Sequence, residues 1–121
     1  MANTFKVVTF AAEPASAGTA YKMYTCARST TTVALGLILT NIHTTAVTAE
    51  VELVSDTGSR GGANNVTNGT SFLAKDVSIP AGTSLELLSG GKVVLEATDE
   101  IKIDCSVADK LSGTLSIMEI T

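Results

Sequence analysis

The feature that most constrains this chain is a period-two alternation of apolar and polar residues in two separate segments. Residues 45–54 read TAVTAEVELV, and residues 99–107 read DEIKIDCSV. Successive side chains of an extended strand point to opposite faces, so each segment places its apolar residues on one side only. Both segments therefore predict half-buried β-strands, and Cys105 is expected on the buried side of the second.

A third segment is apolar on both sides. Residues 30–42 read TTTVALGLILTNI, and strict alternation places one set of apolar residues on each face: Val33, Leu35, Leu37 and Leu39 on the first, and Ala34, Gly36 and Ile38 on the second. A strand that is apolar on both faces is typical of the centre of a sheet, or of a strand whose second face is covered by a neighbour. This segment is therefore expected to be a central strand.

Six further segments share the features of short strands, being rich in β-branched or aromatic residues and bounded by Gly, Pro, Asn, Asp or Ser. They are residues 4–10, 19–25, 71–79, 84–88, 92–97 and 112–120. Helical spacing of apolar residues is not sustained anywhere in the sequence. About eight or nine short strands with brief connections predict a single all-β domain over residues 1–121, an antiparallel β-sandwich with jelly-roll or Greek-key connections. A small barrel is the alternative.

The stretch IPAGTSLELLSGGKVVLEATDEIKI, residues 79–103, carries two clusters of turn-forming residues, Pro80-Ala81-Gly82 and Ser89-Gly90-Gly91. Proline presets φ, and glycine allows a positive φ at which a Cβ atom would clash. These clusters predict two turns that fold three short strands back and forth.

Composition argues against several classes of function. The net charge is −4 and the eight basic residues are scattered, whereas nucleic acids and anionic membranes are bound by clustered Lys and Arg. No apolar run reaches the roughly 18 residues of a membrane span, and no signal peptide is recognisable. We therefore expect no nucleic-acid or membrane partner, and a protein made in the cytoplasm.

Candidate catalytic and metal-binding residues are few. Cys26, Cys105 and His43 lack the spacing of a zinc site, and a reducing compartment favours free thiols, with a disulfide as the alternative. The acids Glu100 and Asp104 share a strand face with a lysine, which favours a solvated surface over paired acid–base catalysts. The sequence predicts no enzyme and no metal site.

The longest connection is residues 55–70, SDTGSRGGANNVTNGT, which is expected to be an exposed loop. Loops of this length often serve in binding, so Arg60, Gly61, Gly62, Asn64 and Asn65 are candidate contacts to a partner. Residues 1–18 are expected to form an edge strand of their own sheet or an arm that pairs with another subunit, with Phe5 and Val7 as further candidate contacts.

Seven segments carry a further pattern: Tyr24-Thr25-Cys26, Thr31 to Leu37, Thr40-Asn41-Ile42, Ile79 to Leu88, Gly90 to Ala97, Asp99 to Ile103, and Ser116 to Thr121. Together they resemble small structural proteins of tailed-bacteriophage virions, especially phages of cyanobacteria and other aquatic bacteria. The resemblance runs from about residue 19 to the C-terminus and leaves out the first strand and the long loop. Ala27 stands where the family often has Pro after the Cys, and Thr98-Asp99 stands where it often has Gly-Asp.

This resemblance implies a non-enzymatic structural role without a cofactor, in a virion assembled in the bacterial cytoplasm. A capsid decoration or cement protein is the first expectation, as a homo-oligomer, in particular a trimer, that binds the major capsid protein. A neck, tail or fibre-associated component is the second. A carbohydrate-binding module, which would present Tyr21 and Tyr24 to a sugar, is a third hypothesis from a different class.

Overall fold

The computed structural model describes residues 2–55, 69–88 and 90–121. Nine strands form in this part of the chain: β1 (Asn3–Glu13), β2 (Tyr21–Thr25), β3 (Thr31–Asn41), β4 (Val47–Val54), β5 (Thr70–Ile79), β6 (Ser84–Leu87), β7 (Val93–Leu95), β8 (Glu100–Cys105) and β9 (Leu111–Ile120). The described residues contain no helix. The predicted all-β class is confirmed, and each segment predicted to be a strand overlaps one of these elements.

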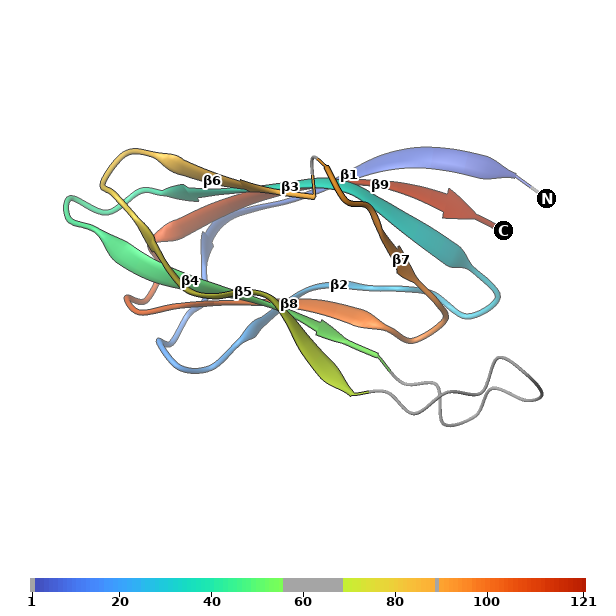
Figure 1. Ribbon diagram of the computed structural model, residues 1–121, viewed down its shortest axis with the longest axis horizontal. Coiled ribbons are helices and arrows are strands. Elements are labelled where there is room, and N and C mark those ends of the chain that lie inside the picture. The colour runs from blue at the N-terminus through green and yellow to red at the C-terminus, as the bar shows by residue number, and fades with distance from the viewer. Residues whose placement is uncertain (1, 56–68, 89) are drawn as a thin grey trace.

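The strands form two antiparallel sheets that face each other (Figure 1). Sheet A has the order β1-β9-β3-β6, with β7 also paired to β3, and sheet B has the order β2-β8-β4-β5. The pairs β1/β9, β2/β8, β3/β6–β7 and β4/β5 make one long antiparallel ribbon that turns back between β4 and β5. Rolling this ribbon places alternate pairs in opposite sheets, which is the jelly-roll form of the predicted sandwich.

The centre of sheet A is β3, as its apolar sequence predicts. It pairs with β9 along one edge and with β6 and then β7 along the other. The predicted assignment of the β3 side chains to the two faces is wrong, however, because the register with β9 shifts between Ala34 and Gly36. This bulge puts Ala34 on the same buried side as Leu37 and Leu39. An inserted residue reverses the alternation beyond it, which a strict period of two cannot anticipate.

The two turn clusters lie between strands as predicted, but the strands do not fold back and forth in one sheet. At the first turn Gly82 has φ 71°, and the amide of Thr83 donates to the carbonyl of Pro80 over 3.2 Å. There the chain crosses from β5 in sheet B to β6 in sheet A. Both β6 and β7 are antiparallel to β3, so they lie one after the other along its edge instead of pairing together.

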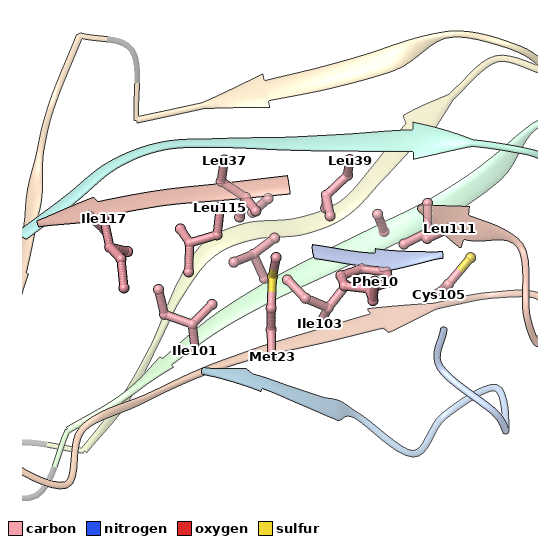
Figure 2. Packing of buried hydrophobic residues seen from close by; sticks show 14 of the residues in the cluster. Phe10, Met23, Leu37, Leu39, Ile101, Ile103, Cys105, Leu111, Leu115 and Ile117 are labelled. Atoms are coloured by element: carbon pink, nitrogen blue, oxygen red, sulfur yellow. The ribbon is translucent and has the colours of Figure 1, made fainter. Parts of the chain in front are cut away.

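The core lies between the sheets and is aliphatic (Figure 2). Leu37, Leu115 and Ile117 from sheet A point toward Ile101 and Ile103 from sheet B, and all five are at most 1% exposed. This agrees with the alternation seen in residues 99–107, in which Cys105 is also buried.

One aromatic ring fills the end of this core. Phe10 of β1 lies opposite Gly113 of β9, and its ring packs edge-on against Tyr21, with 5.2 Å between the ring centroids. A Cβ atom added to Gly113 would come within 2.2 Å of the Phe10 ring. The glycine therefore makes room for the only buried phenylalanine among the described residues.

Candidate functional site

The structure places two of the predicted contact residues on the outside of sheet A. Phe5 and Val7 lie on the same face of β1, and their side chains are 72% and 63% exposed. The strand that carries them is the edge of sheet A and pairs with β9 from Asn3 to Glu13. Residues 3–13 thus form an edge strand of their own sheet. The other predicted contacts, Arg60, Gly61, Gly62, Asn64 and Asn65, lie outside the described residues and remain a prediction.

Phe5 belongs to an apolar row that crosses sheet A. It lies opposite Met118 of β9, Met118 lies opposite Val33 of β3, and Val33 lies opposite Val94 of β7. Directly opposed side chains of neighbouring strands are close enough to touch, so the row forms one continuous strip. The residues at its two ends are the most exposed, Phe5 at 72% and Val94 at 55%.

The neighbouring rows on this outer face carry small polar and aliphatic residues. Val7 lies opposite Ser116, and Ser116 lies opposite Gly36. The outward positions of sheet A that are paired across strands are Asn3, Phe5, Val7, Thr9, Thr31, Val33, Gly36, Ile38, Thr40, Ser84, Glu86, Val94, Ser112, Thr114, Ser116, Met118 and Ile120. Of these described positions only Glu86 is charged, whereas 17% of the whole chain is charged. We call these positions the uncharged face.

A hollow of about 330 Å³ opens in the middle of the uncharged face. It is lined by Leu35, Gly36, Leu37, Ile38, Glu86, Thr114 and Ser116. The hollow forms where the bulge in β3 coincides with a residue that has no side chain. A Cβ atom built on Gly36 would meet no atom within 4 Å, so the space lies on the outside of the sheet.

The outer face of sheet B is different in kind, because its strands carry paired charges. Lys75 contacts Glu50 at 2.6 Å, and Lys22 contacts Glu100 at 3.0 Å. Lys75 also lies 4.7 Å above the ring of Phe72, the exposed aromatic residue of this face. The hydrogen bond to Glu50 raises the pKa of Lys75. Glu100 therefore lies on an ion-paired outer face with Lys22 and Lys102, although its own side chain is only 19% exposed and so less solvated than predicted.

Sheet B also has an acidic hollow of about 360 Å³, lined by Ala17, Gly18, Thr48, Glu50, Asp76, Asp104, Cys105 and Ser106. Two of its three acids, Asp104 and Glu50, have partners within the protein. Oδ1 of Asp104 accepts hydrogen bonds from the amides of Gly18 and Cys105, and Glu50 is paired with Lys75. Within the described ranges no group of three or more His, Cys, Asp or Glu side chains is arranged to hold a metal ion.

The three residues weighed as metal ligands lie in separate places. Cys26 follows β2, Cys105 ends β8, and His43 lies in the turn after β3, where its amide donates to Oδ1 of Asn41 over 2.7 Å. Both cysteines are buried free thiols, and burial raises the pKa of Cys105. A thiol that is buried and resists ionisation is a poor nucleophile.

Sequence reasoning missed a polar group that links the two sheets. The hydroxyl of Tyr24 in β2 donates to Glu119 in β9 over 2.6 Å, and Lys6 in β1 contacts the same carboxylate at 2.7 Å. Desolvation, together with the hydrogen bond to Glu119, raises the pKa of Tyr24 to about 12. The hydrogen bonds from Lys6 and Tyr24 lower the pKa of Glu119. Alternation along the strand would have located it, because Glu119 follows Leu115 and Ile117 on the inward-facing positions of β9.

The tyrosines proposed for sugar binding are engaged within the fold. Tyr21 packs against Phe10, and Tyr24 donates its hydroxyl to Glu119. The two exposed aromatic residues, Phe5 and Phe72, lie on outer faces of different sheets. The aromatic residues therefore do not gather into one platform.

Comparison of the chain with protein-family models, with curated proteins and with solved structures gives no match. A search of the described residues for a helix long and apolar enough to cross a membrane also finds none.

Proposed function

We propose that this chain is a non-enzymatic structural protein of a tailed-phage virion, acting as a capsid decoration or cement protein. The observation that carries an assembly role is the uncharged face of sheet A. A β-sheet face exposed to water ordinarily carries charged side chains, as sheet B does here. A face of Ser, Thr and aliphatic residues loses little hydration when it is covered, so it is suited to burial against protein.

The viral setting rests on two further supports. The first is the resemblance of the segments from Tyr24 to Thr121 to small virion proteins. The second is the jelly-roll topology, which recurs in viral capsid domains. The same topology also occurs in lectins, and a fold alone does not determine a function. The uncharged face and the resemblance together support the virion role over the lectin role.

In this role the sandwich acts as a rigid spacer whose uncharged face is covered in the assembled particle. A protein that binds only the assembled state stabilises that state by mass action, which is how a cement protein strengthens a shell. The partners are further copies of the chain and the major capsid protein, and the location is the virion, assembled in the bacterial cytoplasm. A neck, tail or fibre-associated position uses the same face and is the alternative.

The test is the copy number of the chain in purified virions, measured by quantitative mass spectrometry against the major capsid protein. A decoration protein occupies every equivalent capsid position, so its copy number should be comparable with that of the capsid protein. Roughly a dozen copies or fewer would move the assignment to the neck or tail, where rings have few subunits. Absence from washed virions would overturn the proposal.

Glycan binding needs a separate test because the lectin alternative shares the fold. A glycan array probed with the wild-type protein should give no signal. A signal that is lost in a Phe72→Ser variant would instead favour a sugar-binding surface on sheet B. A signal lost in Phe5→Ser would place sugar binding on the uncharged face and contradict its use in assembly.

A further inference from the structure

We propose that the uncharged face binds a second copy of the chain about a two-fold axis, with Phe5 of each copy inserted into the hollow beside Gly36 of the other. This inference rests on the proposed use of the face in protein assembly and names the partner. It is carried by four features of the face: a projecting ring, a hollow, the distance between them, and the lack of charge.

The projecting group is Phe5, which has the most exposed side chain among the large apolar residues described, at 72%. It stands on an edge strand and has only Met118 directly opposite on its own face. Large exposed aromatic side chains commonly anchor interfaces by filling a pocket on the partner. Phe5 therefore needs a receiving hollow on whatever covers the face.

The same face supplies such a hollow. The space beside Gly36 has a volume of about 330 Å³. That volume is at the lower end of pockets that accept small ligands, so an aromatic ring can enter it. Leu35 and Ile38 line it together with the short Thr114 and Ser116, and Glu86 also lies in the lining. An apolar wall rimmed by small hydroxyls suits a phenyl ring.

The distance between ring and hollow permits both insertions at once. Phe5 is opposite Met118, and Gly36 is opposite Ser116, so the two positions are two strands apart and two residues apart along the strands. Standard sheet spacings give about 10 Å across and about 7 Å along, or roughly 12 Å on the diagonal. A two-fold axis that lies in the interface, midway along this diagonal and perpendicular to it, superposes each Phe5 on the other copy's Gly36. Such a contact is isologous and closes as a dimer.

Charge and area fit a second copy as the partner. Each chain carries a net charge of −4, so two copies approach best through a face that is almost free of charge. The strands β1, β9 and β3, with β6 and β7 end to end beside β3, make a footprint of roughly 19 by 27 Å, or about 500 Å² on each copy. Two such footprints give about 1,000 Å², which is the lower bound for a specific interface. The dimer is therefore expected to be reversible.

A two-fold pair differs from the trimer that the family resemblance implies. In a trimer with three-fold symmetry, every contact joins two different patches of the chain. The Phe5 side chain and the hollow lie on the same face, so two copies fill each other's hollow in a single two-fold contact. Mass measurements separate the two states, since a dimer has twice the monomer mass of 12.4 kDa and a trimer three times that mass.

The test is sedimentation of the purified full chain from about 5 µM to about 500 µM, a range that brackets reversible association. The wild type should rise with concentration to twice the monomer mass. Phe5→Ser removes the ring and should weaken association at least tenfold. Gly36→Val puts a branched side chain into the hollow, at a position where a Cβ atom meets no other atom of the chain, and it should weaken association by a similar factor while thermal stability is kept.

The matched control is Phe72→Ser, which removes an exposed phenylalanine from sheet B and should leave association unchanged. Three results would each overturn the proposal. The wild type could stay monomeric at every concentration, its mass could level off at three chains, or the Gly36→Val variant could associate like wild type. A monomeric protein that is still abundant in virions would reject the two-fold pair and leave the virion role standing. A protein that forms the dimer but is absent from virions would support the two-fold pair and reject the virion role.

Discussion

The two outer faces of the sandwich come from the same alternating pattern but have opposite chemistry. On sheet B the outward positions carry ion pairs, such as Lys75 with Glu50 and Lys22 with Glu100. On sheet A the corresponding positions carry Ser, Thr and aliphatic residues, with Glu86 as the only charged residue among those described. Both faces are compatible with a stable sandwich, because stability depends mainly on the residues between the sheets.

The difference separates what folding requires from what assembly requires. Charged groups keep a face in contact with water, because burying them without partners is costly. Hydroxyl and aliphatic side chains lose less hydration, and the exposed Phe5 and Val7 gain from being covered. Sheet B therefore presents a charged surface that is costly to bury, and sheet A presents one whose burial costs less hydration.

The largest expected effect comes from comparing a glycine on the buried side of sheet A, Gly113, with one on its outer side, Gly36. A methyl group added at Gly113 would clash with the Phe10 ring, so Gly113→Ala should lower the free energy of unfolding by about 2–3 kcal/mol, in the range of overpacked cores. The same change at Gly36 adds a methyl group in open space and should alter stability by less than about 0.5 kcal/mol. Urea denaturation of both variants checks this. Equal losses at the two glycines would mean that both sides of sheet A are packed.

The second prediction places a charge on each outer face. Ser116→Lys puts an ammonium group at the centre of the uncharged face and should weaken self-association at least tenfold, about 1.4 kcal/mol, because covering the face would remove water from the charge and the nearby Glu86 offsets only part of that cost. Thr48→Lys puts the same group beside Glu50, Asp76 and Asp104 on sheet B and should leave association unchanged. Sedimentation equilibrium measures both. A loss of association only in Thr48→Lys would show that sheet B is the contact face.

How much of this was predictable depends on whether a feature is local. The strands at residues 45–54 and 99–107 were predicted because alternation is local, and Val51, Ile101 and Ile103 are fully buried as expected. The phase of β3 was mispredicted because the bulge near Gly36 arises from pairing with β9, about eighty residues away in sequence. Phe5 and Val7 were named as contacts, but the remainder of the uncharged face was not.

The uncharged face was missed for the same reason. Its residues come from strands at both ends and in the middle of the chain, and they become neighbours only through the jelly-roll strand order. A Ser or Thr at a single outward position is unremarkable, and only the cross-strand rows show that charge is lacking. Strand order depends on long-range pairing, which local sequence patterns do not encode.

The third prediction concerns Glu119, an acid on the inward side of sheet A. Lys6 and Tyr24 lower its pKa, so its stabilising contribution is present above the ordinary glutamate pKa of about 4.3 and is lost as pH falls through the lower folded value. Glu119→Gln should lower the free energy of unfolding by about 1 kcal/mol at neutral pH, the usual value of a hydrogen bond. The deficit should shrink below about pH 4. Urea denaturation at several pH values measures it, and a deficit that is constant down to pH 3 would contradict this role.

The smallest expected effect concerns the ion pair that typifies sheet B. Lys75 contacts Glu50 and lies over Phe72, but its side chain is 56% exposed and water screens both contacts. Lys75→Met should therefore shift the melting temperature by no more than about 2 °C, and self-association should stay as in wild type. Differential scanning calorimetry at low and high salt is the measurement, because a screened pair contributes still less when salt is added. A large, salt-independent loss would show that sheet B's charges support the fold as its core residues do. The contrast between a solvated face and a binding face would then have to be withdrawn.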